Sequence, residues 1–236
     1  MLRLYDHRTG RAEPLPGGPG LRVQLAAAEG RRVLVVTDLL RRVAQRAGKR
    51  VRVASTAPLP GDCSDYNVAA FEVLDAPMPN ADVHVFSGPG GSDPGRSGPG
   101  SGPGGSGAEG LVVTVPPETG DWASADPLAV RLAMLEVPYR EPLDLSGEAV
   151  ADATERLDGW RAAVAEWATA PGRPMSREHA AEAETALADD LGSPGALAVL
   201  DRLAYDADIP PGAKLETFIH LDMLLAVGLV SAIGGT

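Results

Sequence analysis

The stretch of sequence that decides the fold runs from residue 21 to residue 53, LRVQLAAAEGRRVLVVTDLLRRVAQRAGKRVRV. Its first five residues alternate apolar and polar side chains, as a half-buried strand does. An apolar, β-branched run at 33–36 leads into residues 38–44, which have helical spacing and end at Gly48, a common helix terminator. Residues 51–53 alternate again. The order strand, helix, strand predicts a βαβ unit and therefore a parallel sheet.

Shorter patterns on either side predict the remaining elements. Apolar runs predict further strands at 2–5, 83–86 and 111–115. A short helix is expected at 66–74, because prolines follow it at positions 77 and 79. Everything beyond Pro117 is expected to be helical, at 127–135, 146–168, 176–191, 194–207 and 215–227. Ser146 and Ser176 are the expected N-caps of two of these helices.

Residues 88–110 are almost wholly glycine, serine and proline. Such a segment cannot bury enough apolar area to offset its ordering entropy, so it predicts a flexible linker. The predicted fold class is α/β plus α, a truncated Rossmann-like parallel sheet unit followed by a helical bundle. The expected division is an α/β domain at 1–87 with 111–120, the linker at 88–110, and an α-helical domain at 121–236.

Charge is unevenly distributed along the 236 residues, whose formal net charge is −11. Residues 1–56 carry about +8 and residues 120–236 about −12. The basic block is a candidate contact for RNA or another anion, whereas charge runs are more often solvated or meet an acidic part of the same protein. Aromatic residues, the usual companions of single-strand binding, are absent from it. The candidate contacts are Arg31, Arg32, Arg41, Arg42 and Lys49.

The cellular setting follows from what the sequence lacks. No apolar run reaches 18 residues, so no membrane span or membrane partner is expected. The N-terminal residues have no apolar stretch like the core of a signal peptide. A single cysteine, Cys63, excludes an internal disulfide framework and fits a reducing compartment. A cytoplasmic protein is therefore expected.

An ordered set of segments carries a family resemblance: LYD at 4–6, LRVQL at 21–25, VVTDLLRR at 35–42, ADPLAVRLAML at 125–135 and ADDLGSPGAL at 188–197. Together they resemble the class I cysteinyl-tRNA synthetases and the related cysteine ligase of mycothiol synthesis. The segments after Ala125 are the most specific, because their order and spacing both match. The resemblance implies an ATP-dependent ligase with a zinc ion that binds the substrate thiolate.

The residues that carry this chemistry in the family are missing. The first zinc ligand would fall near Ala26, the place of the His-x-Gly-His signature is taken by Glu29-Gly30-Arg31-Arg32, and the place of the Lys-Met-Ser-Lys-Ser loop is taken by residues 104–110. Alanine cannot ligate a metal. Adenylate formation puts negative charge on a phosphate, which fixed cationic donors must meet. We therefore predict no catalytic, cofactor-binding or metal-binding residue, and neither ATP nor zinc as a cofactor. Arg31 and Arg32 are the only candidate substitutes.

Other motifs favour structural roles. The glycines at 88–93 are not followed by a helix, which a phosphate-binding loop needs. Acidic neighbours predict a raised thiol pKa for Cys63 and hence an unreactive side chain. Trp160 and Trp167 are expected in the core, His220 is expected to be packed, and Asp189-Asp190 is expected to be solvated.

Three functional hypotheses remain open. The first is a catalytically degenerate paralogue that binds or regulates a protein partner or forms a homo-oligomer, which is why the chain is predicted not to be an enzyme. The second is an active ATP-dependent amino-acid ligase, or a synthetase-like enzyme, that uses non-standard residues. The third is an RNA- or anion-binding module built on the basic block. We favour the first, because structural segments are retained while catalytic motifs are lost.

Overall fold

The computed structural model describes residues 1–27, 30–88 and 110–234. Its central sheet has five strands in the order β5-β4-β3-β6-β7, and every neighbouring pair is parallel. In chain order these strands are β3 (Gly20–Ala27), β4 (Arg50–Ser55), β5 (Glu72–Val73), β6 (Val83–Ser87) and β7 (Leu111–Val115). Helix α1 (Arg32–Arg46) connects β3 to β4. The predicted βαβ unit and the Rossmann-like parallel sheet are therefore confirmed.

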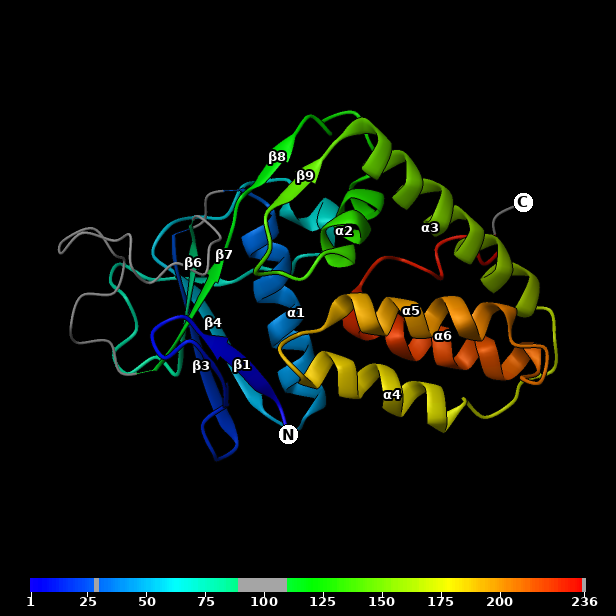
Figure 1. Ribbon diagram of the computed structural model, residues 1–236, viewed down its shortest axis with the longest axis horizontal. Coiled ribbons are helices and arrows are strands. Elements are labelled where there is room, and N and C mark those ends of the chain that lie inside the picture. Colours follow the sequence, from blue (N-terminus) through cyan, green and yellow to red (C-terminus); the bar gives the residue numbers. More distant parts are fainter. Residues whose placement is uncertain (28–29, 89–109, 235–236) are drawn as a thin grey trace.

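Helix α1 begins six residues earlier than the sequence pattern predicts. Residues 33–36 are apolar and rich in β-branched valine, yet they lie inside the helix. The reason is that α1 is buried throughout its first nine residues, between the sheet and the helices that follow (Figure 1). A helix covered on all sides is apolar on all sides, so its N-terminal part shows no amphipathic spacing.

The second half of the chain is mostly helical, as expected. It contains α2 (Pro127–Glu136), α3 (Gly147–Trp167), α4 (Arg177–Ala188), α5 (Ser193–Tyr205) and α6 (Pro211–Leu225). Trp160 and Trp167 both make edge-on ring contacts with Phe218 of α6, at centroid distances of 6.2 Å and 5.0 Å. The prediction that these tryptophans belong to the core is confirmed, because both are almost fully buried.

Two small sheets complete the fold. Strands β1 (Arg3–Asp6) and β2 (Arg11–Pro14) form an antiparallel hairpin. It lies against the outer edge of the central sheet, where the His7 amide donates to the Val112 carbonyl at 2.9 Å. Strands β8 (Glu118–Gly120) and β9 (Leu143–Leu145) form a parallel pair. Strand β8 precedes α2 in the chain and β9 follows it. The expectation that all elements beyond Pro117 are helices is therefore wrong.

The prediction of a helix at 66–74 is also wrong. The chain forms the 3-10 helix η1 (Cys63–Tyr66) and later the edge strand β5. Asn67 has a left-handed backbone, with φ of 53°, which ends the turn. Val68 and Phe71 are buried at helical spacing, but their segment is irregular.

The two expected serine caps differ. The Ser146 hydroxyl accepts a hydrogen bond from the Ala149 amide at 3.3 Å, which confirms it as the cap of α3. The Ser176 hydroxyl makes no cap bond and instead lies 2.8 Å from Nδ1 of His179. The helix it precedes ends at Ala188, short of residue 191, because Asp190 and Leu191 adopt positive φ angles.

One hydrophobic core extends from the sheet through α1 into the helices. It includes Val23 of β3, Leu39 of α1 and Leu221 of α6. The division into an α/β domain and an α-helical domain stays a prediction. Most of the predicted linker, residues 89–109, lies outside the described residues. None of the described helices has the length and apolar character that a membrane-spanning segment needs.

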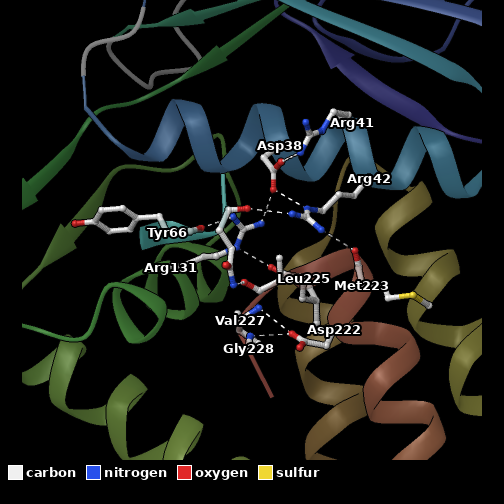
Figure 2. A network of polar contacts seen from close by, with 12 residues as sticks. Asp38, Arg41, Arg42, Tyr66, Arg131, Asp222, Met223, Leu225, Val227 and Gly228 are labelled. Carbon is white, nitrogen blue, oxygen red and sulfur yellow. Dashed lines mark hydrogen bonds and ion pairs between the residues drawn. The ribbon is translucent and has the colours of Figure 1, made fainter. Parts of the chain in front are cut away.

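A buried polar network joins α1 to the helices around it (Figure 2). The guanidinium of Arg131, on α2, is fully buried and pairs with Asp38 of α1 at 3.0 Å. Its other nitrogens donate to the carbonyls of Leu225 and Tyr66, at 2.7 Å and 2.8 Å. Because each guanidinium nitrogen of Arg131 has an acceptor, the buried charge is stabilised by these hydrogen bonds as well as by the ion pair with Asp38.

Candidate functional site

A cleft of about 500 Å³ opens at the carboxyl edge of the central sheet. In open parallel sheets, ligands bind at this edge, near the point where the strand order reverses. Here the reversal lies between β3 and β6, because β4 is placed on one side of β3 and β6 on the other. The cleft is lined by residues that follow β3, β4 and β7, among them Gly30, Asp62, Glu118 and Trp122.

Glu118 is the central residue of this cleft. Its carboxylate accepts hydrogen bonds from the backbone amides of Arg31 and Arg32, at 2.5 Å and 3.1 Å. These amides are the free donors at the N-terminus of α1, where the helix dipole favours negative charge. The side chain of Arg31, at the cap position, makes no cap bond of its own. Glu118 therefore caps α1 from a distant part of the chain.

Gly30 provides the space for this contact. Its φ angle is 86°, a conformation that residues with a side chain rarely adopt. A Cβ atom at this position would lie 2.5 Å from Oε2 of Glu118. The glycine and the carboxylate thus fit together as a pair.

The cleft is also lined by Asp62 and by Tyr66 of η1, the short helix that follows Asp62. Arg31 extends its guanidinium to Asp62, with nitrogen–oxygen distances of 2.9 Å and 3.2 Å. Tyr66 and Trp122 also line the cleft, and burial is the main cause of the raised pKa of Tyr66. Burial is also the main cause of the raised pKa of the Cys63 thiol, with a smaller contribution from Asp62. The predicted direction for this thiol is confirmed, although burial contributes more than acidic neighbours.

Sequence comparison identifies related proteins for part of this chain. No family model matches it. An L-cysteine:1D-myo-inositol 2-amino-2-deoxy-alpha-D-glucopyranoside ligase of Thermomonospora curvata is 40% identical over 110 residues, which are 44% of this chain and 26% of that protein. The ligase of the same name from Acidothermus cellulolyticus is 39% identical over 107 residues, or 45% and 26% of the two chains. That of Streptomyces griseus is 40% identical over 108 residues, or 44% and 25%.

Less than half of this chain is thus similar to these cysteine ligases. It spans about a quarter of the length of the curated relatives it matches. The resemblance inferred from the ordered segments is therefore confirmed.

The two arginines beside the cleft are already engaged by partners within the chain. Arg31 is paired with Asp62, as described above. Arg32 is fully buried and donates to the carbonyls of Pro138 at 2.9 Å, Val137 at 3.3 Å and Glu141. Burial lowers the pKa of Arg32 to about 10.

The other basic candidates lie along α1 and after it, and the structure does not bring them together in the cleft. Arg41 and Arg42 both pair with Asp38, the latter at 2.7 Å. Arg42 also donates to the Met223 and Asn67 carbonyls, at 3.1 Å and 3.0 Å. Lys49 donates to the carbonyls of residues 16 and 18, at 2.8 Å and 3.0 Å. These contacts place most of the basic block's charge against partners within the chain.

The residues present do not fit the zinc ion that the resemblance implies. All four histidines and the lone cysteine lie in the described residues. No three histidine, cysteine, aspartate or glutamate side chains of the described residues are grouped closely enough to hold a metal ion. His220 instead pairs with Glu184 at 2.7 Å in a nearly buried position, which confirms the expected packed histidine.

The acidic pair in the family-like segment at 188–197 also has structural partners. Asp189 is exposed and pairs with Arg3 at 2.8 Å. Asp190 accepts hydrogen bonds from the Tyr139 hydroxyl at 2.6 Å and from the Tyr5 amide at 2.8 Å. Its expected role on a solvated face is therefore wrong, because it ties β1 to the segment after α2.

Sequence reasoning missed Glu118, Asp62 and Trp122. A local signal did exist for Glu118, since it is the first acidic residue after the apolar strand β7 and two prolines. Polar residues that directly follow parallel strands gather at one edge of the sheet. Its partner amides, those of Arg31 and Arg32, lie 87 and 86 residues earlier, which no local pattern could indicate.

Proposed function

We propose that this chain is a non-catalytic relative of the cysteine ligases that acts as a binding or regulatory protein. The relation to those ligases rests on the sequence comparison. The loss of catalysis and the regulatory role are the proposed parts. The observation that supports them most directly is the carboxylate of Glu118 at the N-terminus of α1.

The electrostatics of the cleft oppose nucleotide activation. Adenylate formation requires fixed positive groups where negative charge develops on the transferring phosphate. Here the N-terminal amides of α1 already bind the carboxylate of Glu118, and the nearest guanidinium, that of Arg31, is paired with Asp62. Asp121 adds a further exposed carboxylate to the lining. A triphosphate approaching this edge would meet net negative charge.

Neither lysine can take the place of the missing loop. Lys49 lies beyond the C-terminal end of α1, and its ammonium group is bound to two backbone carbonyls. Lys214 is on α6, where it donates to the Ala204 carbonyl at 2.9 Å. Losing one donor to a developing oxyanion typically costs about 2.7–4 kcal/mol of transition-state stabilisation, so losing a whole set leaves only background activity.

Cysteine-dependent exchange between ATP and pyrophosphate tests this proposal. The purified chain is compared with the Thermomonospora curvata ligase under identical conditions, and circular dichroism establishes that both are folded. We expect exchange by the ligase and none above background by this chain. Exchange that depends on cysteine and on the amount of this chain would overturn the proposal in favour of an active ligase with Arg31 in a new role.

A further inference from the structure

A second hollow lies on the helical half of the molecule, between α3 and α5. It has a volume of about 610 Å³ and shares no residue with the cleft at the sheet edge. Residues of α3 at positions 152, 155, 156, 159, 160 and 163 form one wall, and residues 201, 204 and 205 of α5 form the other. Their spacing along α3 is that of a single helix face. We refer to this hollow as the α3–α5 groove.

The floor of the groove is aromatic and its one cation is already neutralised. Trp160 is only 4% exposed, and the guanidinium of Arg156 lies 4.7 Å from its ring centroid. Arg156 also pairs with Glu136 and Asp201, each at 2.5 Å. Arg156 is therefore held against Trp160 at the floor of the groove, and its charge does not neutralise the other acidic side chains of the groove.

The rim of the groove is acidic, and its two carboxylates on α3 have no partner within the described part of the chain. Asp152 and Glu155 are exposed, and neither makes an ion pair or a side-chain hydrogen bond to another described residue. Asp201 remains 43% exposed despite its pairing with Arg156. The groove consequently offers two carboxylates without a described partner on its α3 wall, whereas the one carboxylate on its α5 wall is already bound by Arg156.

Two further features make the groove accessible to a protein segment. Tyr205, at the end of α5, is 89% exposed, which is unusual for a large aromatic side chain. Gly159 lies in the interior of α3, and a Cβ atom there would meet nothing within 4 Å. A glycine at such a site lowers helix stability without any packing reason in this chain. It leaves the floor of the groove open to close approach.

We propose that the α3–α5 groove docks a basic, arginine-bearing segment of a protein partner. A guanidinium is planar, stacks on an aromatic ring such as that of Tyr205, and forms two parallel hydrogen bonds with a carboxylate. Charge complementarity selects this occupant, because the acidic rim repels nucleic acids and anionic lipid surfaces alike. The inference rests on the proposed binding function and adds the chemistry of the partner.

A synthetic alanine-based helical peptide with arginines one turn apart serves as the probe, and the same peptide with glutamates replaces it as a control. NMR of the isotope-labelled full chain maps the binding position, and calorimetry gives the affinity. We expect the arginine peptide to shift amide signals of α3 and α5. The double variant Asp152→Asn, Glu155→Gln should bind it about tenfold more weakly, which corresponds to loss of about 1.4 kcal/mol.

A steric variant separates the groove from general acidity. Gly159→Leu introduces a good helix former and fills the groove, so it should abolish the shifts without changing net charge. Ala151→Leu, on an exposed part of α3 outside the groove, is the matched control and should bind as the wild type does. Equal binding by Gly159→Leu and wild type, or shifts spread over the whole acidic surface, would overturn the proposal.

Two other outcomes of these experiments also test the groove proposal. Self-association that Gly159→Leu abolishes would assign the groove to a second copy of this chain and overturn the partner proposed here. Absence of peptide binding together with absence of pyrophosphate exchange would refute the groove alone. Pyrophosphate exchange would refute the proposed function whatever the peptide does.

Discussion

At the scale of single residues, the carboxylate of Glu118 determines the character of the cleft. It is 9% exposed and accepts two hydrogen bonds from backbone amides that have no other acceptor in the helix. Hydrogen bonds to a charged acceptor are about twice as strong as neutral ones, and a negative charge at a helix N-terminus is favourable. The same side chain therefore stabilises α1 and makes its N-terminus a poor site for an anion.

The variant Glu118→Gln tests this stabilising role. It preserves size but replaces the charged acceptor with a neutral amide that has a single acceptor oxygen. We expect the free energy of unfolding in urea to fall by about 1–2 kcal/mol. Asp121→Asn, a charge removal at an exposed position directly after β8, is the control and should change it by less than about 0.5 kcal/mol. Equal effects of the two variants would contradict a specific cap.

At the scale of elements, helices and strands differ in what their glycines do. Gly159 lies in open space within α3 and has no need of a positive φ angle. Gly120, in β8, has a φ angle of 111°, and a Cβ atom there would lie 2.3 Å from the Leu145 carbonyl oxygen of β9. One glycine is therefore dispensable for the fold, and the other is required for the β8–β9 pair.

Alanine substitution should change the free energy of unfolding in opposite directions at these two glycines. Gly159→Ala is expected to raise the free energy of unfolding by about 0.5–1 kcal/mol, because alanine costs less backbone entropy in a helix. Gly120→Ala is expected to lower it by more than about 1 kcal/mol, because the added methyl group clashes with backbone at a strained φ angle. Thermal or urea unfolding of both variants measures the difference. A loss of stability in Gly159→Ala would show that α3 needs this glycine.

The contact between α4, α6 and α1 predicts a dependence on pH. Burial opposes ionisation of Glu184, but hydrogen bonds with His220 and Arg46 outweigh it and hold the pKa of Glu184 below its ordinary value. A carboxyl group with a lowered folded-state pKa stabilises the fold above its unfolded pKa of about 4.3. That contribution is lost as the pH falls through the lowered folded-state pKa.

Urea unfolding between neutral pH and pH values below about 4 checks this contribution. We expect Glu184→Gln to lose less stability in acid than the wild type does. Glu178→Gln changes an exposed glutamate on the same helix and should follow the wild-type curve. Parallel curves for Glu184→Gln and the wild type would contradict the assignment.

At the scale of the whole molecule, α1 joins the sheet to the helices. The core is continuous across it, and the Arg131–Asp38 pair holds α2 against it in a fully buried position. Removing Arg131 would take one of three arginine partners from the buried Asp38 and would leave the carbonyls of Leu225 and Tyr66 without this buried donor. The molecule should therefore unfold as one unit, and this pair should be essential to it.

Replacing Arg131 with methionine tests both points. We expect Arg131→Met to lower the free energy of unfolding by about 3–5 kcal/mol. Arg202→Met removes an exposed pair with Glu182 and should cost less than about 1 kcal/mol. Circular dichroism and tryptophan fluorescence should report one coincident transition in the wild type. Two separate transitions would show that the halves are independent domains.

The sequence was informative where structure depends on neighbours along the chain. The alternation at 21–25 and 51–53 predicted the parallel strands, and Ser146 marked a helix start that depends on one local hydrogen bond. It failed where distant contacts decide. The buried setting of α1 hid its first turns, and the left-handed Asn67 broke a segment with helical spacing. Glu118 could not be assigned to the α1 amides because nothing local connects them.

The most direct test of the central claim is a titration of the labelled chain with magnesium–ATP, followed through the amide signals of Arg31 and Arg32. We predict that these two signals stay in place at nucleotide concentrations that saturate the Thermomonospora curvata ligase, because Glu118 retains both amides. Saturable movement of both signals, with release of the Glu118 carboxylate, would contradict the claim and favour a chain that binds the nucleotide.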